Sequence, residues 1–346
     1  MEVQPAVLKS LIIHNVGSKN NLDALVLSEN ELEPDDETAQ MLKDSFLSRF
    51  RDNAEYHAFT HTSSLHFNEM YAYCRQLFNE EKPFVEISTS MARHLYEQST
   101  HPKVKGGELY ICFFEGLPVD GRNHTAIGLF KTENKSMFLE ATTKKRQVDM
   151  KMREGVELNK MDKGCLIINR KAEDGYDVLL FDNQNRGEEA QYWKEKFLGL
   201  TPQKNEFHHT THLMALTKQF ITGPLEAEEN ITRTEQVELL NRSLDYFKGN
   251  DSFDIENFQK EVFQDEERIN AFRDFGSRYV EQNDYDIAAS FDISAGAVKK
   301  QSRIFKSVLK LDKNFHIYIH GRTDLIEKGT DDNGRKFYKI YYQEEN

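Results

Sequence analysis

The sequence contains only three cysteines in 346 residues, with no CxxC pair and no apolar run long enough to span a membrane. An odd number of cysteines without that spacing favours buried, reduced thiols at Cys74, Cys112 and Cys165. A spanning helix needs about 20 consecutive apolar residues, which no window provides. The first residues also lack the basic and apolar segments of a secretory signal. These absences predict a cytoplasmic protein without a membrane partner.

Catalytic motifs are also lacking. The sequence has no phosphate-binding loop, no G-x-S-x-G elbow and no paired-carboxylate signature, and Gly121 and Gly128 are scattered turn and strand glycines. No cofactor is therefore predicted, and the chain is not expected to be an enzyme.

The nearest approach to a metal motif is the HHTTH segment. His208 and His212 have the spacing of a metal pair on one face of a predicted helix. His209 occupies the place of the glutamate that metalloproteases use as a general base. Packed or surface histidines are therefore the favoured interpretation and no metal is predicted, with a metal-assisted hydrolase as the alternative.

Positive charge is scarce overall. Lys and Arg number 45 against 58 Asp and Glu, which gives a net charge of −13. A protein that neutralises phosphates normally has a basic surface, so the total counts against a nucleic-acid partner. The distribution of the cations must decide the question.

Apolar residues, in contrast, suffice for packed cores. They make up 38% of the chain, with 24 Phe and 14 Tyr. A chain of 346 residues is longer than a domain with a single hydrophobic core usually is. We predict an α+β protein of two domains. Residues 1–225 would form a mostly antiparallel sheet with covering helices, and residues 226–346 a mainly helical domain that ends in a β-hairpin. The acidic stretch 226–230 marks the predicted boundary.

Local patterns support this plan. Strand-like alternation occurs in three runs, 108–116, 124–132 and 136–143, and turn residues separate predicted hairpin strands. Helices are predicted where apolar residues recur at helical spacing, two of them directly after Pro34 and Pro83. The predicted hairpins pair 11–13 with 25–27, 163–169 with 176–182, and strands near the C-terminus around Asp332-Asn333-Gly334; further helices are predicted at 188–198 and 207–221.

Several segments carry a family resemblance. They are LVLSENELEPDDE (25–37), GGELYICFFEG with AIGLFKTENKSMFLE (106–140), DKGCLIIN (162–169) and EKFLGLTPQKNEFHHTTHLMALTKQFI (195–221). In order and spacing the chain resembles the NdpA family of bacterial nucleoid-associated proteins over nearly its whole length, most clearly in the first two thirds. The resemblance implies a nucleoid location and DNA binding. It supplies no catalytic residues and no DNA motif at the level of residues.

Residues 286–311 fit a helix-turn-helix in part. Apolar residues and an alanine occupy suitable positions for two closely packed helices. However, Asp292 stands where glycine usually makes the turn, and Gln301 where a second apolar anchor is expected. The positions that fit are Ile287, Ala288, Phe291, Ile293 and Val298.

The same region carries a stripe of cations. With Ser294 as N-cap, a helix that runs to Leu311 would place four cations on one face and apolar residues on the other. This face matches a track of phosphates, and a solvated amphipathic helix is the alternative. A second basic run follows a predicted strand and continues to Lys151 and Arg153; it would either clamp DNA or protect a sheet edge. The candidate DNA-binding residues are Lys299, Lys300, Arg303, Lys306, Lys310, Lys144, Lys145 and Arg146.

These observations predict a non-catalytic, nucleoid-associated DNA-binding protein that contacts the backbone with little sequence specificity. DNA and other nucleoid proteins are the expected partners, and self-association is compatible with the sequence. The net charge of −13 motivates an alternative, which is an acidic protein–protein adapter within the nucleoid that has no direct affinity for DNA.

Overall fold

The computed structural model describes residues 5–50, 55–144, 147–183, 192–227, 231, 233–283, 285–302, 305, 308–311, 314–318 and 325–344. The chain divides into two compact units, an N-terminal unit Met1–Gln203 and a C-terminal unit Lys204–Asn346. Each unit is described by itself.

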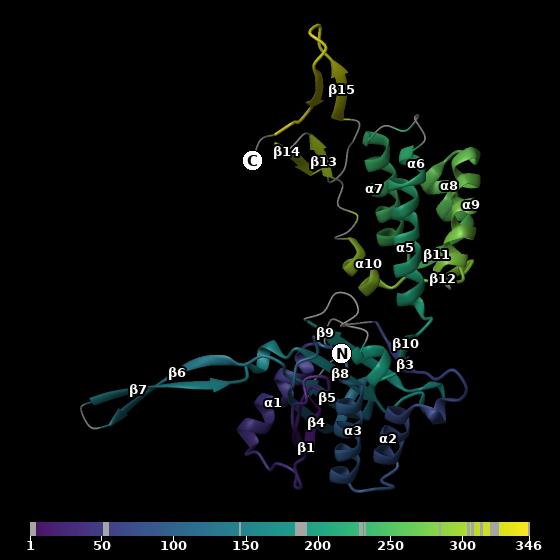
Figure 1. The fold of residues 1–346 in the computed structure, drawn as a ribbon. Coiled ribbons are helices and arrows are strands. Elements are labelled where there is room, and N and C mark those ends of the chain that lie inside the picture. The colour runs from purple at the N-terminus through teal and green to yellow at the C-terminus, as the bar shows by residue number, and fades with distance from the viewer. Residues whose placement is uncertain are drawn as a thin grey trace. The chain divides into compact units, whose positions relative to one another are not determined.

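An eight-stranded antiparallel sheet forms the centre of the N-terminal unit (Figure 1), in the order β10-β3-β9-β8-β5-β4-β1-β2. The predicted pairing around Asp174-Gly175 is confirmed, since β8 and β9 are antiparallel neighbours. The strand that follows the first turn also pairs as predicted, β2 with β1. The strands are β1 Val7–Val16, β2 Leu25–Val26, β3 His57–Phe59, β4 Gly107–Val119, β5 Arg122–Lys131, β8 Lys163–Ile168, β9 Asp177–Asp182 and β10 Leu200–Pro202.

Helices cover both faces of this sheet. One apolar cluster joins the sheet to α1 (Asp36–Ser48), and another joins its opposite face to α2 (Glu69–Phe78) and α3 (Phe84–Gln98). The predicted helix starts are confirmed: α1 begins after Asp35, whose carboxylate accepts from the Thr38 N–H at 2.7 Å, and α3 begins directly after Pro83. Because both faces are covered, all six residues of β8 are buried.

Two further strands of the N-terminal unit lie outside this sheet. β6 (Ser136–Lys144) and β7 (Gln147–Gly155) pair with each other and form a separate two-stranded ribbon that projects from the N-terminal unit (Figure 1). The short helical turns of this unit are η1 Leu65–Phe67, η2 Leu158–Lys160, η3 Ala172–Asp174 and η4 Tyr192–Phe197.

The predicted helix 188–198 is not an α-helix where the structure describes it. Residues 188–191 lie outside the described part, and η4 is a single π-helical turn. A π-helix bonds residues five apart, so its turn is wider than that of an α-helix. Tyr192, Trp193 and Phe197 are all buried in the core by this turn.

The C-terminal unit is mainly helical. α5 contacts α6, α7, α9 and α10, and the unit's core is rich in phenylalanine and tyrosine. The predicted helix 207–221 is confirmed as α5, which ends before Gly223 and Pro224. The elements are α5 Glu206–Thr222, α6 Pro224–Ala227, α7 Arg233–Gly249, β11 Ser252–Asp254, α8 Ile255–Phe263, α9 Glu266–Asn283, β12 Ser290–Asp292, α10 Ala295–Ser302, β13 Val308–Leu311, β14 Phe315–Tyr318, β15 Ile326–Thr330 and β16 Lys336–Ile340.

The α+β class is confirmed, with two adjustments. The terminal hairpin turns at Asp331–Gly334 as predicted, where Asp331 accepts from the Asn333 and Arg335 N–H groups. The strand before it, β14, belongs to a different hairpin, because it pairs with β13. The contacts of α5 place it in the C-terminal unit. The boundary between the two compact units therefore lies after Gln203, earlier in the chain than residue 225. The boundary between independently folding domains at 225/226 stays a prediction.

Candidate nucleic-acid interface

The helix-turn-helix interpretation of residues 286–311 is wrong. Residues 286–289 are neither helix nor strand, and Ser290–Asp292 form β12, which pairs with β11. The ring of Phe291 stacks on Phe253 of β11, with centroids 4.8 Å apart and planes at 21°. Phe291, which the motif would have placed in its first helix, therefore lies in a strand and is partly buried against the core.

The single helix with four aligned cations is also wrong. α10 begins after Ser294, whose hydroxyl accepts from the Ala297 N–H at 3.3 Å, but it ends at Ser302. Lys310 lies in β13 opposite His316, because the alternating residues 308–311 pair with β14. Arg303 and Lys306 lie outside the described residues. Helical spacing therefore does not bring Lys310 into line with Lys299.

Lys299 and Lys300 remain candidates on α10. Both are exposed, whereas Ala297 and Val298 are buried. The Lys300 ammonium lies 5.3 Å from the centroid of the Phe207 ring, a cation–π contact that leaves the charge at the surface. The structure thus provides one exposed basic pair here.

The second basic run lies on the β6–β7 ribbon. Lys144 is the last residue of β6 and pairs with Gln147, while Lys145 and Arg146 lie outside the described residues. Because side chains alternate between the two faces of a ribbon, the register assigns each residue to a face. One face, termed the polar face, carries Phe138, Glu140, Thr142, Gln147, Asp149, Lys151 and Arg153.

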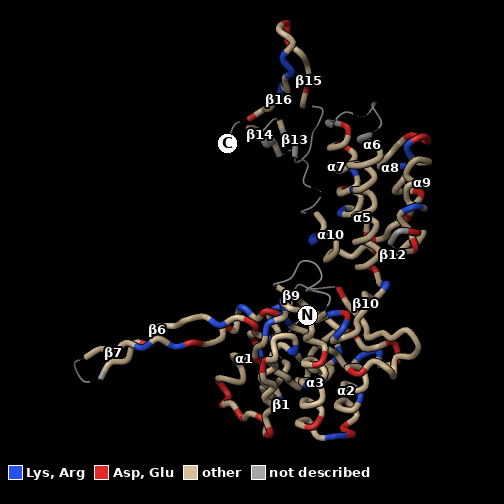
Figure 2. The backbone as a smooth tube through the Cα atoms, viewed as in Figure 1, with Lys and Arg blue, Asp and Glu red and all other residues tan. Residues whose placement is uncertain are grey.

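The ribbon is positively charged within an acidic chain. Residues 136–155 contain five basic and three acidic residues, although the whole chain has a net charge of −13. Charged positions occur along both strands (Figure 2). Lys151 is exposed and has no ion pair among the described residues. Arg153 Nε lies 2.8 Å from Glu140 Oε2, with the two side chains 63% and 44% exposed, so this surface ion pair can open at little cost.

Other charges are buried in the sheet. Lys131 and Lys163 face each other across β5 and β8 and are fully buried. Lys131 Nζ donates to Glu133 at 2.9 Å, and Lys163 Nζ donates to both oxygens of Asp182 at 3.0 and 3.1 Å. Burial lowers the pKa of Lys131, and the neighbouring Glu133 opposes that shift. These charges neutralise one another inside the protein, which indicates a structural role.

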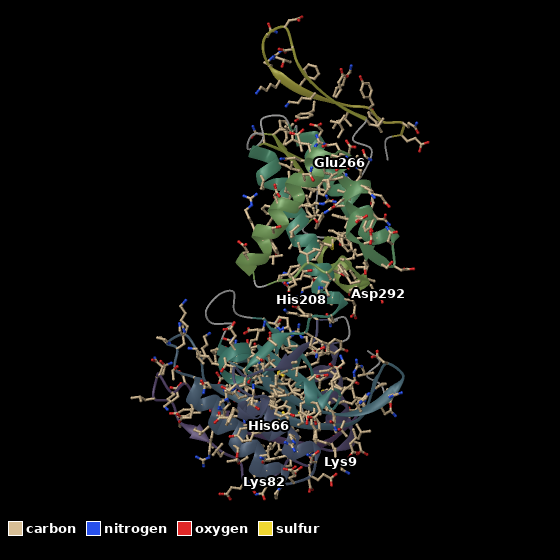
Figure 3. All side chains as sticks on the ribbon, turned by 90° about the vertical axis from the view of Figure 1, so that its right-hand side faces the viewer. Lys9, His66, Lys82, His208, Glu266 and Asp292 are labelled. Carbon is tan, nitrogen blue, oxygen red and sulfur yellow. The ribbon has the colours of Figure 1, made fainter. Side chains whose placement is uncertain are left out.

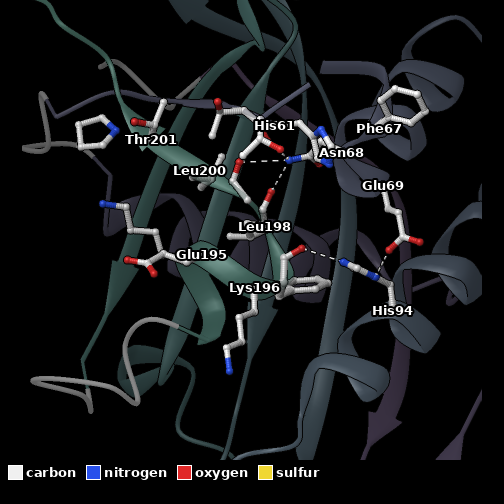
Figure 4. A pocket seen from close by; sticks show the side chains of 16 residues that line it. His61, Phe67, Asn68, Glu69, His94, Glu195, Lys196, Leu198, Leu200 and Thr201 are labelled. Atoms are coloured by element: carbon white, nitrogen blue, oxygen red, sulfur yellow. Dashed lines mark hydrogen bonds and ion pairs between the residues drawn. The ribbon is translucent and has the colours of Figure 1, made fainter. Parts of the chain in front are cut away.

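A pocket of about 730 Å³ lies beside β10 and the start of α2 (Figure 4). The Asn68 amide donates to the carbonyls of Thr60, Leu198 and Gly199 at 3.0–3.1 Å. His94 Nε2 lies 3.0 Å from the Phe197 carbonyl oxygen, and its Nδ1 contacts Glu69. The polar side chains thus anchor the backbone of the pocket wall.

The histidines of the HHTTH segment pack against an aromatic residue. His208 lies in the first turn of α5 (Figure 3), and the His212 ring stacks on Tyr285 with centroids 4.6 Å apart. The His208 and His212 centroids are 4.2 Å apart. Burial lowers the pKa of His209. Within the described residues no three His, Cys, Asp or Glu side chains are grouped as metal ligands.

The strand that carries Lys151 and Arg153 was missed from the sequence. The segment VDMKMRE alternates apolar and charged residues, which is the pattern of a strand exposed on one face. This alternation would have predicted a hairpin with the preceding strand SMFLEATT. It would also have placed the two cations on one face of that strand.

Comparisons with known proteins agree with the resemblance. No helix among the described residues is long and apolar enough to cross a membrane. A comparison with curated proteins gives no match. The family model described as nucleoid-associated protein YejK matches residues 12–335. Because this match spans most of the chain, the chain belongs to this family, the NdpA family of bacterial nucleoid-associated proteins.

Proposed function

We propose that this chain is a DNA-binding protein of the nucleoid that contacts the DNA backbone, has little sequence specificity and catalyses no reaction. Its family is that of a nucleoid-associated protein. The observation that carries the proposal is the projecting β6–β7 ribbon, which has an excess of positive charge in an acidic chain.

The dimensions of the ribbon suit DNA. Each strand has nine residues, which span about 30 Å at roughly 3.3 Å per residue. The major groove admits a two-stranded ribbon, and contacts to phosphates fix a protein on the duplex without reading its sequence. Lys151 and Arg153, two positions apart on β7, would lie on the same side of such a ribbon. We expect both to contact phosphates, with Arg153 exchanging Glu140 for a phosphate oxygen.

The remaining candidates would extend this surface. Lys144, Lys145 and Arg146 follow one another where β6 passes to β7, so they would add charge at the tip of the ribbon. Lys299 and Lys300 would form a second contact on α10, with Arg303, Lys306 and Lys310 following in the sequence.

The absence of catalysis is part of the proposal. The ionisable groups around Lys131 and Lys163 are buried and mutually paired. None of them lines the pocket beside β10. A reacting substrate would therefore not reach these groups through that pocket.

The test is DNA binding measured by fluorescence anisotropy over a series of salt concentrations. Lys151→Gln with Arg153→Gln should weaken binding equally for unrelated duplexes. The slope of log affinity against log salt should become shallower by roughly 0.9 for each phosphate that the variant no longer neutralises. The matched control is Lys82→Gln with Lys260→Gln, which removes the same charge at two other exposed lysines.

Two results would refute the proposal. One is no binding even at low ionic strength, or binding that does not depend on salt. The other is an equal loss of affinity in the ribbon variant and in the control, because net charge alone would then account for the effect.

An adapter role is the second candidate, and the net charge of −13 favours it. Such a protein would bind other nucleoid proteins without direct affinity for DNA. Affinity purification before and after nuclease treatment separates the two: an adapter keeps its partners when DNA is removed, and a DNA-binding protein loses those held through DNA.

A further inference from the structure

Three exposed methionines lie together on the β6–β7 ribbon, on the face opposite the polar face. The register places Met137 of β6 and Met150 and Met152 of β7 on this face. They are 60%, 69% and 59% exposed, respectively. A small soluble oxidant can therefore reach these three sulfur atoms. The methionines packed in the cores are at most 1% exposed, namely Met70, Met91, Met161 and Met214.

The cysteines do not compete for such an oxidant. Cys74, Cys112 and Cys165 are fully buried, and burial raises the pKa of each thiol. The thiolate is the reactive form of cysteine, so these side chains stay inert. Met41 of α1 is 54% exposed. Among the described residues, the accessible sulfur atoms are thus that of Met41 and the three on the ribbon.

The ribbon is held together mainly by its own strand pairing. β6 and β7 pair with no strand of the eight-stranded sheet. Residues 137–154 belong to none of the hydrophobic clusters that the described residues form. A two-stranded ribbon by itself is only marginally stable in water. Small changes in the contacts between its strands should therefore shift it between an ordered and a frayed state.

Methionines account for much of the apolar pairing between the two strands. Met152 lies opposite Leu139, Met150 lies opposite Ala141, and Met137 is a diagonal neighbour of Met152. Opposite side chains of an antiparallel pair have Cβ atoms about 4.5–5.5 Å apart, and long side chains also reach diagonal neighbours. The order of the ribbon thus depends on thioether side chains that water and oxidants reach.

Hydrogen peroxide oxidises a thioether by transferring one oxygen atom to the sulfur. The S–O bond forms as the O–O bond breaks, the sulfur loses two electrons, and the other peroxide oxygen leaves as water with both protons. The product is methionine sulfoxide, which is polar. Methionine sulfoxide reductases restore the thioether: the oxygen leaves as water, and a dithiol is oxidised to a disulfide.

We propose that these methionines form an oxidation site that switches the ribbon. Oxidation of Met150 and Met152 weakens the cross-strand pairs and the ribbon frays, so Lys151 and Arg153 on the polar face lose their fixed spacing. The effect on DNA rests on the proposed function, in which these two cations contact phosphates. A frayed ribbon must be ordered again when it binds, and this ordering costs affinity. Reduction of the sulfoxides restores the ordered ribbon.

Peroxide titration of the full chain, followed by peptide mass spectrometry, tests the site. Met137, Met150 and Met152 should be oxidised together with Met41 and before the four buried methionines. Hydrogen exchange of the same samples then reports the order of the ribbon. Amide protection within residues 136–155 should fall by roughly two- to thirtyfold on oxidation, which corresponds to the loss of two cross-strand pairs. Protection of β8 should not change.

Leucine variants provide the matched control. Leucine has nearly the volume of methionine and no sulfur, so it keeps the apolar contact and resists the oxidant. The resistant variant combines Met137→Leu, Met150→Leu and Met152→Leu, and its ribbon should keep full protection in peroxide. Met41→Leu removes the accessible sulfur on α1, and its ribbon should lose protection as in the wild type.

Fluorescence anisotropy over the salt series connects the switch to DNA. The affinity of the oxidised wild type should fall by about the same factor as the amide protection of its ribbon. Treatment with methionine sulfoxide reductases of both stereospecificities and dithiothreitol should restore both quantities. The resistant variant should bind equally well before and after peroxide.

Three results would overturn the proposal. They are oxidation of the ribbon methionines no earlier than that of the buried ones, less than a twofold loss of ribbon protection after oxidation, and a loss of DNA affinity that persists in the resistant variant. Hydrogen exchange is measured without DNA. A chain that binds no DNA would therefore refute the proposed function and the last step of the switch, whereas exchange would still decide the oxidation site.

Discussion

Strands β5 and β6 follow one another closely in the chain and have opposite environments. Leu129 of β5 is fully buried between sheet and helices, whereas Leu139 of β6 is 59% exposed on the ribbon. Both strands have sequences rich in apolar residues. The difference shows that an apolar pattern specifies a strand and the face on which each residue lies. Whether that face is buried depends on which other helices and strands pack against it.

The lysines of the two regions differ in the same way. Lys131 and Lys163 are fully buried, each bonded to a carboxylate, and Lys151 is exposed on the ribbon. A buried charge acts on stability through its partner, and an exposed one remains available for an external phosphate. The same residue type thus holds the sheet together in one region and is proposed to bind DNA in the other.

The largest expected effect is the loss of a buried cation. Lys163→Met leaves Asp182 without its buried partner, while Glu133 keeps Lys131, and breaking such a pair costs about 3–5 kcal/mol. Urea denaturation at neutral pH measures the change in the free energy of unfolding. Lys151→Met, the control on the ribbon, should stay within about 0.5 kcal/mol of the wild type. A loss below about 1 kcal/mol for Lys163→Met would contradict the structural role of the network.

Matched leucine truncations compare the two strands directly. Leu129→Ala should lower the free energy of unfolding by about 2–5 kcal/mol, because it opens a cavity in a packed core. Leu139→Ala should change it by less than about 0.5 kcal/mol, because this side chain is 59% exposed. Equal losses in the two variants would mean that the ribbon is packed against the rest of the monomer.

A buried histidine makes the stability of the sheet region dependent on pH. The Ser28 N–H donates to His14 Nδ1 at 3.1 Å, so the ring is neutral and its Nε2–H donates to Ser88 Oγ, also at 3.1 Å. Burial lowers the pKa of His14 from 6.5 to about 4. The unfolded chain therefore takes up this proton at higher pH than the folded protein does.

The stability from neutral His14 is thus fully present above pH 6.5 and is lost as the pH falls through about 4. Over this window the loss should approach about 3 kcal/mol. Thermal unfolding of the wild type and of His14→Gln across this range isolates the contribution, since the variant lacks the titrating group. Parallel pH profiles for the two proteins would contradict the assignment.

The smallest effect is expected at α10. Lys299→Gln with Lys300→Gln should leave the fold intact, at a cost of no more than about 1 kcal/mol because the cation–π interaction with Phe207 is removed. If both lysines contact phosphates, the slope of log affinity against log salt should fall by roughly 0.9 for each. An unchanged slope, compared with the ribbon variant, would restrict the DNA surface to the ribbon.

Much of the fold could be predicted because its determinants are local. Asp35 caps α1, Pro83 precedes α3, and the Asp174-Gly175 turn joins β8 to β9. Each depends on residues that are neighbours in the chain. The family could also be predicted, since ordered segments of sequence carry it.

The site was harder to predict. The cations and apolar residues of 294–311 recur at helical spacing, which predicts one helix. Part of this segment instead pairs as a strand with another part of the chain. Phe291 pairs with β11 and Lys310 with β14, and the spacing of residues along a helix predicts neither pairing. The cations of the second run could be found by composition, and the alternation of VDMKMRE could have placed Lys151 and Arg153 on one face of a strand. That this strand forms a ribbon separate from the eight-stranded sheet could not be predicted.

The sequence by itself determined the α+β class, the family, the helix starts and the tight turns, because capping and turn chemistry act over a few residues. Only the tertiary structure decided which apolar residues are covered and which charges are paired. Burial depends on segments that meet in space, and residues such as Leu129 and Leu139, ten positions apart and alike in chemistry, differ only in what packs on them.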